Sequence, residues 1–231
     1  MSGQLYLLPC PISEAPALDA LPASTVETAR RIDHFLVEAA RTARATLKAM
    51  GHPKPIAELD IVEIGHDPAP ELLQPVLDGA DAAVLSESGC PGVADPGAQI
   101  AARAHELGIR VVPLTGPSSI LLTLMASGLD GQRFRFSGYL PKHDAERRAA
   151  ILAAEKASRA SETQLFIETP YRNTALLDAL LETLAPDTRL TVAIDVTGQN
   201  ESIRTLTAAA WKAIPKAMRT LPKLPTVFAF L

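Results

Sequence analysis

The sequence predicts an α/β fold built from two domains, and three observations lead to this fold class. In the first half, short apolar runs alternate with longer segments that carry apolar residues at helical spacing, a pattern typical of a parallel sheet with helices on both faces. The second half ends in closely spaced runs that favour a mixed sheet. The charge also changes sign, from 8 Lys and Arg against 15 Asp and Glu in residues 1–115 to 14 against 11 in residues 116–231. We therefore expect an N-terminal doubly wound domain over residues 1–115 and a C-terminal mixed α/β domain over residues 116–231.

Each element of the first domain follows from its local pattern. Runs such as DIVEI and AAVLS are short, apolar and partly β-branched, as expected of buried strands, and the segments between them show apolar residues at i, i+3 and i+4. Strands are predicted over residues 5–9, 34–38, 60–64, 82–86 and 110–114, and helices over residues 24–30, 41–50, 69–78 and 99–107.

The second domain has a different texture. A basic helical pattern, a hairpin-like segment at residues 202–206 and a terminal apolar run indicate antiparallel pairing beside helices. Helices are predicted over residues 118–127, 144–158, 171–184 and 207–214, and strands over residues 133–137, 163–168, 190–195 and 226–231.

Composition excludes several classes of protein. A hydrophobic fraction of 47% and a charged fraction of 21% are ordinary for a globular chain. Cys10 and Cys90 are too few for a disulfide framework, and the absence of a C-x-x-C or His/Cys cluster gives no reason to expect a metal. The N-terminus lacks a basic leader, and no apolar stretch reaches the roughly 18 residues of a membrane span. We expect a cytoplasmic protein that does not contact a membrane. The mildly basic second half indicates either an anionic ligand or only a drift in surface composition.

The stretch VLSESGCPGVADPGAQIA, residues 84–101, holds the most informative loop. It joins a predicted strand to a predicted helix through about ten residues, several of them Gly or Pro. A plain connection of this kind needs only about two to six residues. Its exposed backbone suits close approach of a ligand. It is neither a G-x-G-x-x-G fingerprint nor a phosphate-binding loop with Lys. Asp95 precedes Pro96, a common first helical residue, so we expect Asp95 to be a helix cap and the loop as a whole to bind a ligand.

Other candidates follow the remaining strands, where open α/β sheets bind their ligands. Residues 116–119, GPSS, offer hydroxyls and amides or simply cap a helix. Proton transfer or a surface ion pair is open to Glu38 with Arg41, to His66, and to Glu168 with Arg172.

These motifs together resemble the tetrapyrrole methylase superfamily of S-adenosylmethionine (SAM)-dependent methyltransferases. LYLLPCPI is similar to L-Y-V-V-x-T-P-I, and SESGCPGVADPG to S-D-A-G-T-P-G-I-S-D-P-G. VVPLTGPSS, RFRFSGYLP and FIETPYRN also resemble family motifs, in order, over residues 5–173. Within the superfamily, the motifs are most similar to the group that methylates a cytidine 2′-hydroxyl of small-subunit ribosomal RNA.

The resemblance implies two α/β domains, a homodimer, and SAM bound in the cleft between the domains. For an RNA acceptor, we expect Glu38 or Asp95 to be the catalytic residue, as a base or an orienting group. Acceptor-facing positions would be Arg41, His66, Glu168, Pro170 and Arg172, with the two arginines touching phosphate. Carried over by position, the SAM-binding residues would be Pro11, Ser86, Glu87, Ser88, Gly89, Val93, Ser118 and Ser119.

The sequence also departs from the group's motifs. Glu87 stands where the group has Asp, the group's E-D-T-R is Glu38-Ala-Ala-Arg41 here, and its R-E-L-T-K is IDVTG at residues 194–198. The chain stops at Leu231, without the C-terminal extension of many ribosomal members. These differences concern the methyl acceptor more than SAM. We expect a SAM-dependent methyltransferase that acts on RNA; the alternatives are a methylase of a tetrapyrrole or other small metabolite, and a SAM-binding protein without catalysis.

Overall fold

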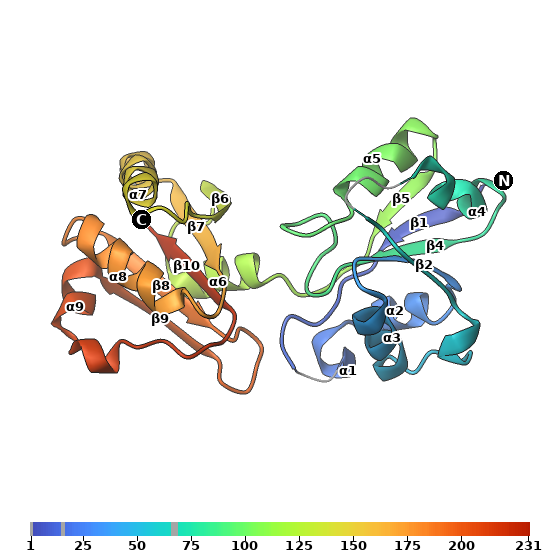
Figure 1. The fold of residues 1–231 in the computed structure, drawn as a ribbon, viewed down its shortest axis with the longest axis horizontal. Coiled ribbons are helices and arrows are strands. Elements are labelled where there is room, and N and C mark those ends of the chain that lie inside the picture. The colour runs from blue at the N-terminus through green and yellow to red at the C-terminus, as the bar shows by residue number, and fades with distance from the viewer. Residues whose placement is uncertain (1, 15–16, 66–68) are drawn as a thin grey trace. The chain divides into compact units, whose positions relative to one another are not determined.

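The chain folds into two compact units, Met1–Ser118 and Ser119–Leu231. They are seen in a computed structural model that describes residues 2–14, 17–65 and 69–231 (Figure 1). No helix among these residues has the length and apolar character needed to cross a membrane.

A five-stranded parallel sheet forms the centre of the first unit. Its order is β3-β2-β4-β1-β5, so the strand order reverses around the middle of the sheet. Every residue of β4 is buried, because helices cover both of its faces. The strands are β1 (Gln4–Leu7), β2 (His34–Val37), β3 (Asp60–Glu63), β4 (Ala82–Leu85) and β5 (Arg110–Pro113).

Two hydrophobic cores lie on the two faces of this sheet. One core includes Val26 of α2 and Leu47 of α3, and the other includes Val76 of α4 and Ile100 of α5. Figure 1 shows the two groups of helices on opposite sides of the strands. The helices are α1 (Ala17–Ala20), α2 (Ala23–Ala29), α3 (Ala40–Ala49), α4 (Gln74–Leu77) and α5 (Ala98–Glu106), with short 3-10 helices η1 (Ile56–Glu58) and η2 (Pro70–Leu73).

The second unit contains a mixed five-stranded sheet of order β6-β7-β10-β8-β9. β6 runs parallel to β7, while β10 pairs antiparallel with both β7 and β8, and β8 pairs antiparallel with β9. The strands are β6 (Phe134–Tyr139), β7 (Thr163–Glu168), β8 (Arg189–Ile194), β9 (Ser202–Thr207) and β10 (Thr226–Phe230).

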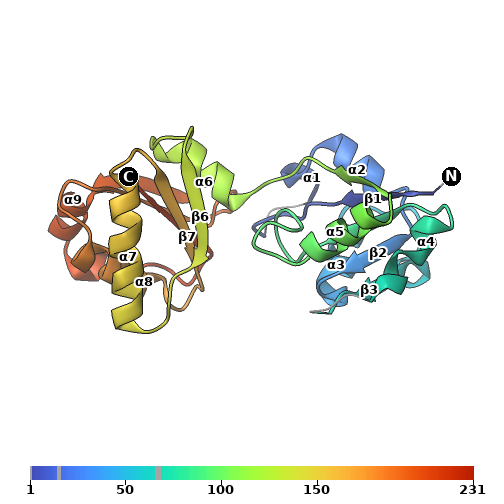
Figure 2. The same cartoon turned by 90° about the horizontal axis from the view of Figure 1, so that it is seen from above.

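Helices α7, α8 and α9 bury a large apolar core against this sheet, and α7 and α8 lie side by side (Figure 2). α6 packs against β9 and β10. The helices are α6 (Ser119–Ser127), α7 (Asp144–Ser158), α8 (Asn173–Thr183) and α9 (Ala208–Ala213), followed by the 3-10 helix η3 (Lys216–Met218).

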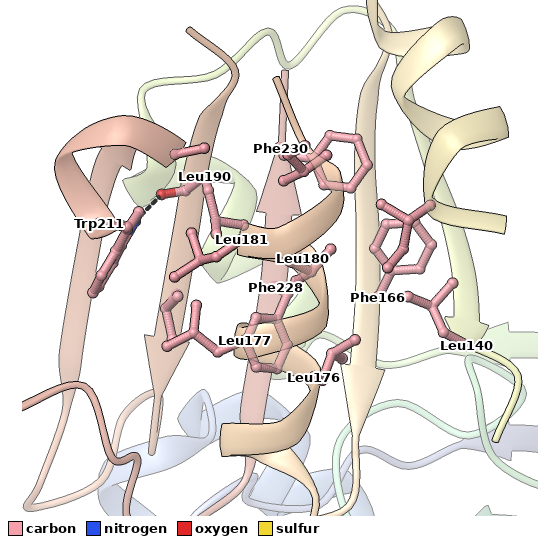
Figure 3. Packing of buried hydrophobic residues seen from close by; sticks show 14 of the residues in the cluster. Leu140, Phe166, Leu176, Leu177, Leu180, Leu181, Leu190, Trp211, Phe228 and Phe230 are labelled. Atoms are coloured by element: carbon pink, nitrogen blue, oxygen red, sulfur yellow. Dashed lines mark hydrogen bonds between the residues drawn. The ribbon is translucent and has the colours of Figure 1, made fainter. Parts of the chain in front are cut away.

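Aromatic residues lie at the centre of the second unit's core (Figure 3). Phe166 and Phe230 stack with ring centroids 5.6 Å apart. The indole N–H of Trp211 donates a hydrogen bond of 2.8 Å to the carbonyl oxygen of Leu190, so this buried polar group is satisfied. Phe228 is fully buried among the same side chains.

The fold class predicted from the sequence is confirmed, and the predicted bounds 144–158 and 163–168 coincide with α7 and β7. The single helix predicted over residues 69–78 is wrong. It is divided into η2 and α4, because Pro75 has no N–H to continue an α-helical ladder across the junction. The short helices α1, η1 and η3 lie outside every helix that the sequence predicted.

Replacing Phe228 with Ala should lower the unfolding free energy of the second unit by about 3–5 kcal/mol, because the cavity left in the core cannot collapse fully. Phe134→Ala on β6, where the ring is 42% exposed, is the matched control and should cost about 1 kcal/mol or less. Urea denaturation followed by the fluorescence of Trp211, the only tryptophan, reports on this unit. Equal losses in both variants would contradict the assignment of this core.

Candidate functional site

The carboxyl ends of the first unit's strands carry the candidate site, because parallel strands bring those ends to one edge of the sheet. The longest connection there is residues 86–97, between β4 and α5. Three glycines of this loop, Gly89, Gly92 and Gly97, have φ values of 68°, 80° and 127°. A Cβ on Gly97 would lie 3.2 Å from both the Gly92 nitrogen and a Val84 methyl. The glycines therefore allow a compact turn that a chain with side chains could not form.

The loop after β1 is joined to this turn by backbone hydrogen bonds. The N–H of Cys10 donates to the carbonyl of Gly89 at 2.8 Å, and the N–H of Gly89 donates back at 3.2 Å. The Cys10 thiol donates to the carbonyl of Ser86, and the Cys90 thiol donates to the carbonyl of Pro117. The pKa of the Cys10 thiol is raised to about 12, mainly because the thiol is buried. Three strand-end loops are thus held together in one cluster.

Carboxylates gather beside this cluster. One oxygen of Glu38 accepts a hydrogen bond of 3.0 Å from the backbone N–H of Glu87, and the Glu87 carboxylate accepts one of 2.9 Å from the hydroxyl of Thr42. The pKa of Asp95 is raised to about 6, first by burial of the carboxyl and then by the charges of Glu38 and Glu87. Asp95 can therefore take up or release a proton near neutral pH.

An open pocket of about 800 Å³ adjoins these groups. Both catalytic candidates, Glu38 and Asp95, line it together with Glu63 and Gly65 from the end of β3 and residues 96–100 from the start of α5. Its walls include the three carboxylates of Glu38, Glu63 and Asp95. Among the residues that the structure describes, no group of three or more His, Cys, Asp or Glu side chains is arranged to hold a metal ion.

One prediction about these side chains is wrong, and one of the open alternatives is not observed among the described residues. Asp95 does not cap a helix: α5 begins at Ala98 behind Gly97, whose φ of 127° inserts a turn, and no side chain bonds the first helical amides. Among the described ion pairs, none joins Glu38 to Arg41, because Glu38 turns to the amide of Glu87 instead.

The predicted cofactor positions divide between the two units. Ser86 is buried and its hydroxyl donates to the carbonyl of Ser88, whereas Glu87 and Ser88 are exposed and Val93 is 46% exposed. Pro11 is half-buried beside them, and Gly89 is buried in the turn. Ser118 ends the first unit, while Ser119 begins α6 in the second.

The predicted acceptor positions are also dispersed. Arg41 is exposed in the first turn of α3, and His66 lies outside the described residues. In the second unit, the buried carboxylate of Glu168 accepts hydrogen bonds from the backbone N–H and the hydroxyl of Thr169, with Arg172 at 3.2 Å. Pro170 is half-buried in the same turn. The structure thus gives Glu168 a structural part in closing the turn before α8.

Two further side chains support the site without having been predicted from the sequence. Thr42 orients Glu87, and Glu63 accepts a hydrogen bond of 2.7 Å from the N–H of Ala40 at the start of α3. Glu63 ends β3 at the same edge of the sheet as Glu38. Its place at the end of a predicted strand is the one feature of the sequence that points to it. Thr42 lies 45 residues from its partner, and no local pattern points to the pair.

Residues 17–211 match the family described as Tetrapyrrole (Corrin/Porphyrin) Methylases. The chain belongs to this family. Methyltransferases of the family use SAM as the methyl donor, and the relationship makes this chain a SAM-dependent methyltransferase.

Relatives at about 30% identity are called ribosomal RNA small subunit methyltransferase I. The protein of Mesorhizobium japonicum is 33% identical over 206 residues, which cover 89% of this chain and 68% of the relative. That of Vibrio cholerae is 30% identical over 204 residues, which cover 87% of this chain and 67% of the relative. The chain therefore spans about two thirds of the length of these relatives.

Solved structures support the fold. Diphthine synthase aligns with a TM-score of 0.67 at 15% identity, over 99% of this chain and 90% of that one. The uroporphyrin-III-C-methyltransferase of Thermus thermophilus aligns with a TM-score of 0.59 at 18% identity, over 99% of this chain and 94% of that one. At these identities the likeness concerns the fold alone.

Replacing Asp95 with Asn should stabilise the first unit at pH 7.5 by about 1 kcal/mol, after discounting for solvent screening. The pKa of about 6 in the folded protein lies above the ordinary aspartate value of 3.8, so the wild type loses stability as the pH rises from about 4 to 6. The difference between variant and wild type should vanish near pH 4. Denaturation followed by circular dichroism at both pH values measures it, with the exposed Glu58→Gln as control. A constant difference at both pH values would contradict the raised pKa.

Proposed function

We propose that this chain transfers the methyl group of SAM to RNA, at a ribose 2′-hydroxyl of the kind found in small-subunit ribosomal RNA. The names of the relatives support the RNA acceptor. The observation that carries the chemistry is the meeting of Glu38 and Asp95 in one pocket, with the pKa of Asp95 near neutrality.

The residues present fit SAM in charge. SAM carries a sulfonium and an ammonium group, and the first unit's loops present the carboxylates of Glu38, Glu87 and Asp95. The neighbouring pocket of about 800 Å³, which Glu38 and Asp95 line, is within the range that holds a small ligand and is the place for the acceptor nucleoside. We assign the donor site to Pro11, the Ser86–Gly89 turn with its exposed Glu87 and Ser88, Val93 and the two serines Ser118 and Ser119.

SAM supplies a methyl group from its sulfonium, and the leaving group is a neutral sulfide. The protein's part is therefore to position the acceptor in line and to receive its proton. In the proposed reaction, the ionised Asp95 carboxylate accepts the proton of the attacking 2′-hydroxyl. Glu38, fixed by the N–H of Glu87, accepts a hydrogen bond from the ribose and orients it. Arg41 at the edge of the same unit contacts phosphate.

The assembly and location are part of the same proposal. Family membership supports a homodimer, and an RNA-modifying role supports a cytoplasmic protein. In the second unit, Leu121 and Met125 of α6 are 50% and 79% exposed, and a second copy of the chain would cover such apolar surface.

Transfer of tritiated methyl groups from SAM to undermethylated small ribosomal subunits tests the proposal. Wild-type protein should label the RNA, and Asp95→Asn should reduce the rate by about 100-fold or more because the proton acceptor is lost. Its affinity for SAM should fall by no more than about tenfold, because Glu38 and Glu87 keep their charges. Glu58→Gln, an exposed carboxylate outside the pocket, is the control and should keep the wild-type rate.

Two results would replace the RNA acceptor. Transfer to a tetrapyrrole or another metabolite, with none to ribosomal subunits, would identify a small-molecule methylase. Tight binding of SAM with no transfer to either substrate would identify a binding protein without catalysis.

A further inference from the structure

A basic segment of the second unit lies over the start of α8. It comprises residues 214–225 between α9 and β10, drawn in red in Figure 1. The N–H of Leu221 donates to the hydroxyl of Thr174 at 3.0 Å, and the fully buried amide of Asn173 donates to the carbonyl of Leu224 at 2.7 Å. Leu221 and Leu224 also pack against the hydrophobic core. The segment is therefore fixed in place although it has almost no regular structure.

The anchoring leaves the segment's polar side chains at the surface. Residues 208–225 contain no Asp or Glu, and neither do residues 169–174 of the adjoining turn. The cations of these two stretches include Arg172, Lys216, Arg219 and Lys223. Lys216 and Lys223 are exposed, while Arg172 and Arg219 are half-buried. Their recorded acidic partners belong to the body of the unit: Lys216 meets Asp178, and Arg172 meets Glu168.

An aromatic ring lies beside one of these cations. Tyr171 is 81% exposed, and the ammonium of Lys223 lies 5.2 Å from the centre of its ring. A tyrosine exposed to this degree buries almost none of its own apolar surface, so folding gives no reason for its position. An exposed ring next to a cation, on a basic surface, is the arrangement by which proteins hold unpaired bases and the phosphates that flank them.

We propose that Tyr171, Arg172, Lys216, Arg219 and Lys223 form a binding surface for single-stranded RNA. A base stacks on the free face of the Tyr171 ring, and the four cations contact successive phosphates. This inference rests on the proposed function, because it assigns a contact surface to the RNA acceptor. A duplex keeps its bases stacked inside and offers no free base to the ring, so the surface selects unpaired RNA.

Fluorescence anisotropy with a labelled, unstructured oligoribonucleotide tests the surface in the full chain. Tyr171→Leu and Lys223→Glu should each weaken binding at least about fivefold. Tyr171→Phe keeps the stacking ring and should bind within about twofold of wild type. Lys156→Glu makes the same charge change at an exposed position of α7 and is the matched control. Replacing Lys223 with Ala should also reduce the slope of log affinity against log salt by about 0.7.

Calorimetry with SAM on the same variants separates the two proposals. Unchanged SAM binding with weakened RNA binding supports the surface. Absence of RNA binding by wild-type protein overturns it, as do losses no larger than that of Lys156→Glu. Binding of a polycarboxylated tetrapyrrole at Tyr171 and Lys223, with no RNA binding, likewise overturns it. Failure to bind SAM, with the RNA pattern intact, would overturn the methyl donor and leave the surface standing.

Discussion

The pair of backbone hydrogen bonds between Cys10 and Gly89 is the constraint on which the site depends. It fastens the loop after β1 to the loop after β4, strands that are neighbours in the sheet. Gly89 has a φ of 68°, and a Cβ there would press against Ile12 at 3.3 Å. With the turn fixed in this way, the amide of Glu87 reaches Glu38, and Asp95 lies close enough to both carboxylates to feel their charge.

The parallel sheet explains why these groups meet at all. Each parallel strand ends at the same edge, so residues distant in the sequence become neighbours without any local signal. The carboxylates gathered there repel one another, and burial adds to the cost of ionising Asp95. This cost is offset by the core on either face of the sheet. The proposed function uses the result, since a cationic methyl donor is attracted to the same charges.

Patterns along the chain predicted what depends on near neighbours. The apolar runs, together with the hairpin-like segment at residues 202–206, predicted the ten strands of the described residues to within two residues at either end. The bounds of α7 coincide with its helical pattern because no proline interrupts it. The prediction that Asp95 caps a helix is wrong because the sequence does not reveal that Gly97 adopts a φ of 127°, so that the helix begins only at Ala98. The hydrogen bonds from Thr42 to Glu87 and from Asn173 to Leu224 join residues 45 and 51 positions apart. Such contacts follow from tertiary packing and not from local preference.

Calorimetric titration of the chain with SAM, on wild type and on Glu87→Gln, tests the central claim that the first unit's acidic turn holds the methyl donor. The substitution keeps the shape of the side chain and its bond to Thr42 but removes the charge that the proposed site offers to the ammonium. We expect saturable binding by wild type and an affinity about tenfold lower for the variant, or about 1.4 kcal/mol. Absence of heat and of any thermal shift at millimolar SAM, or equal affinities for both proteins, would contradict it.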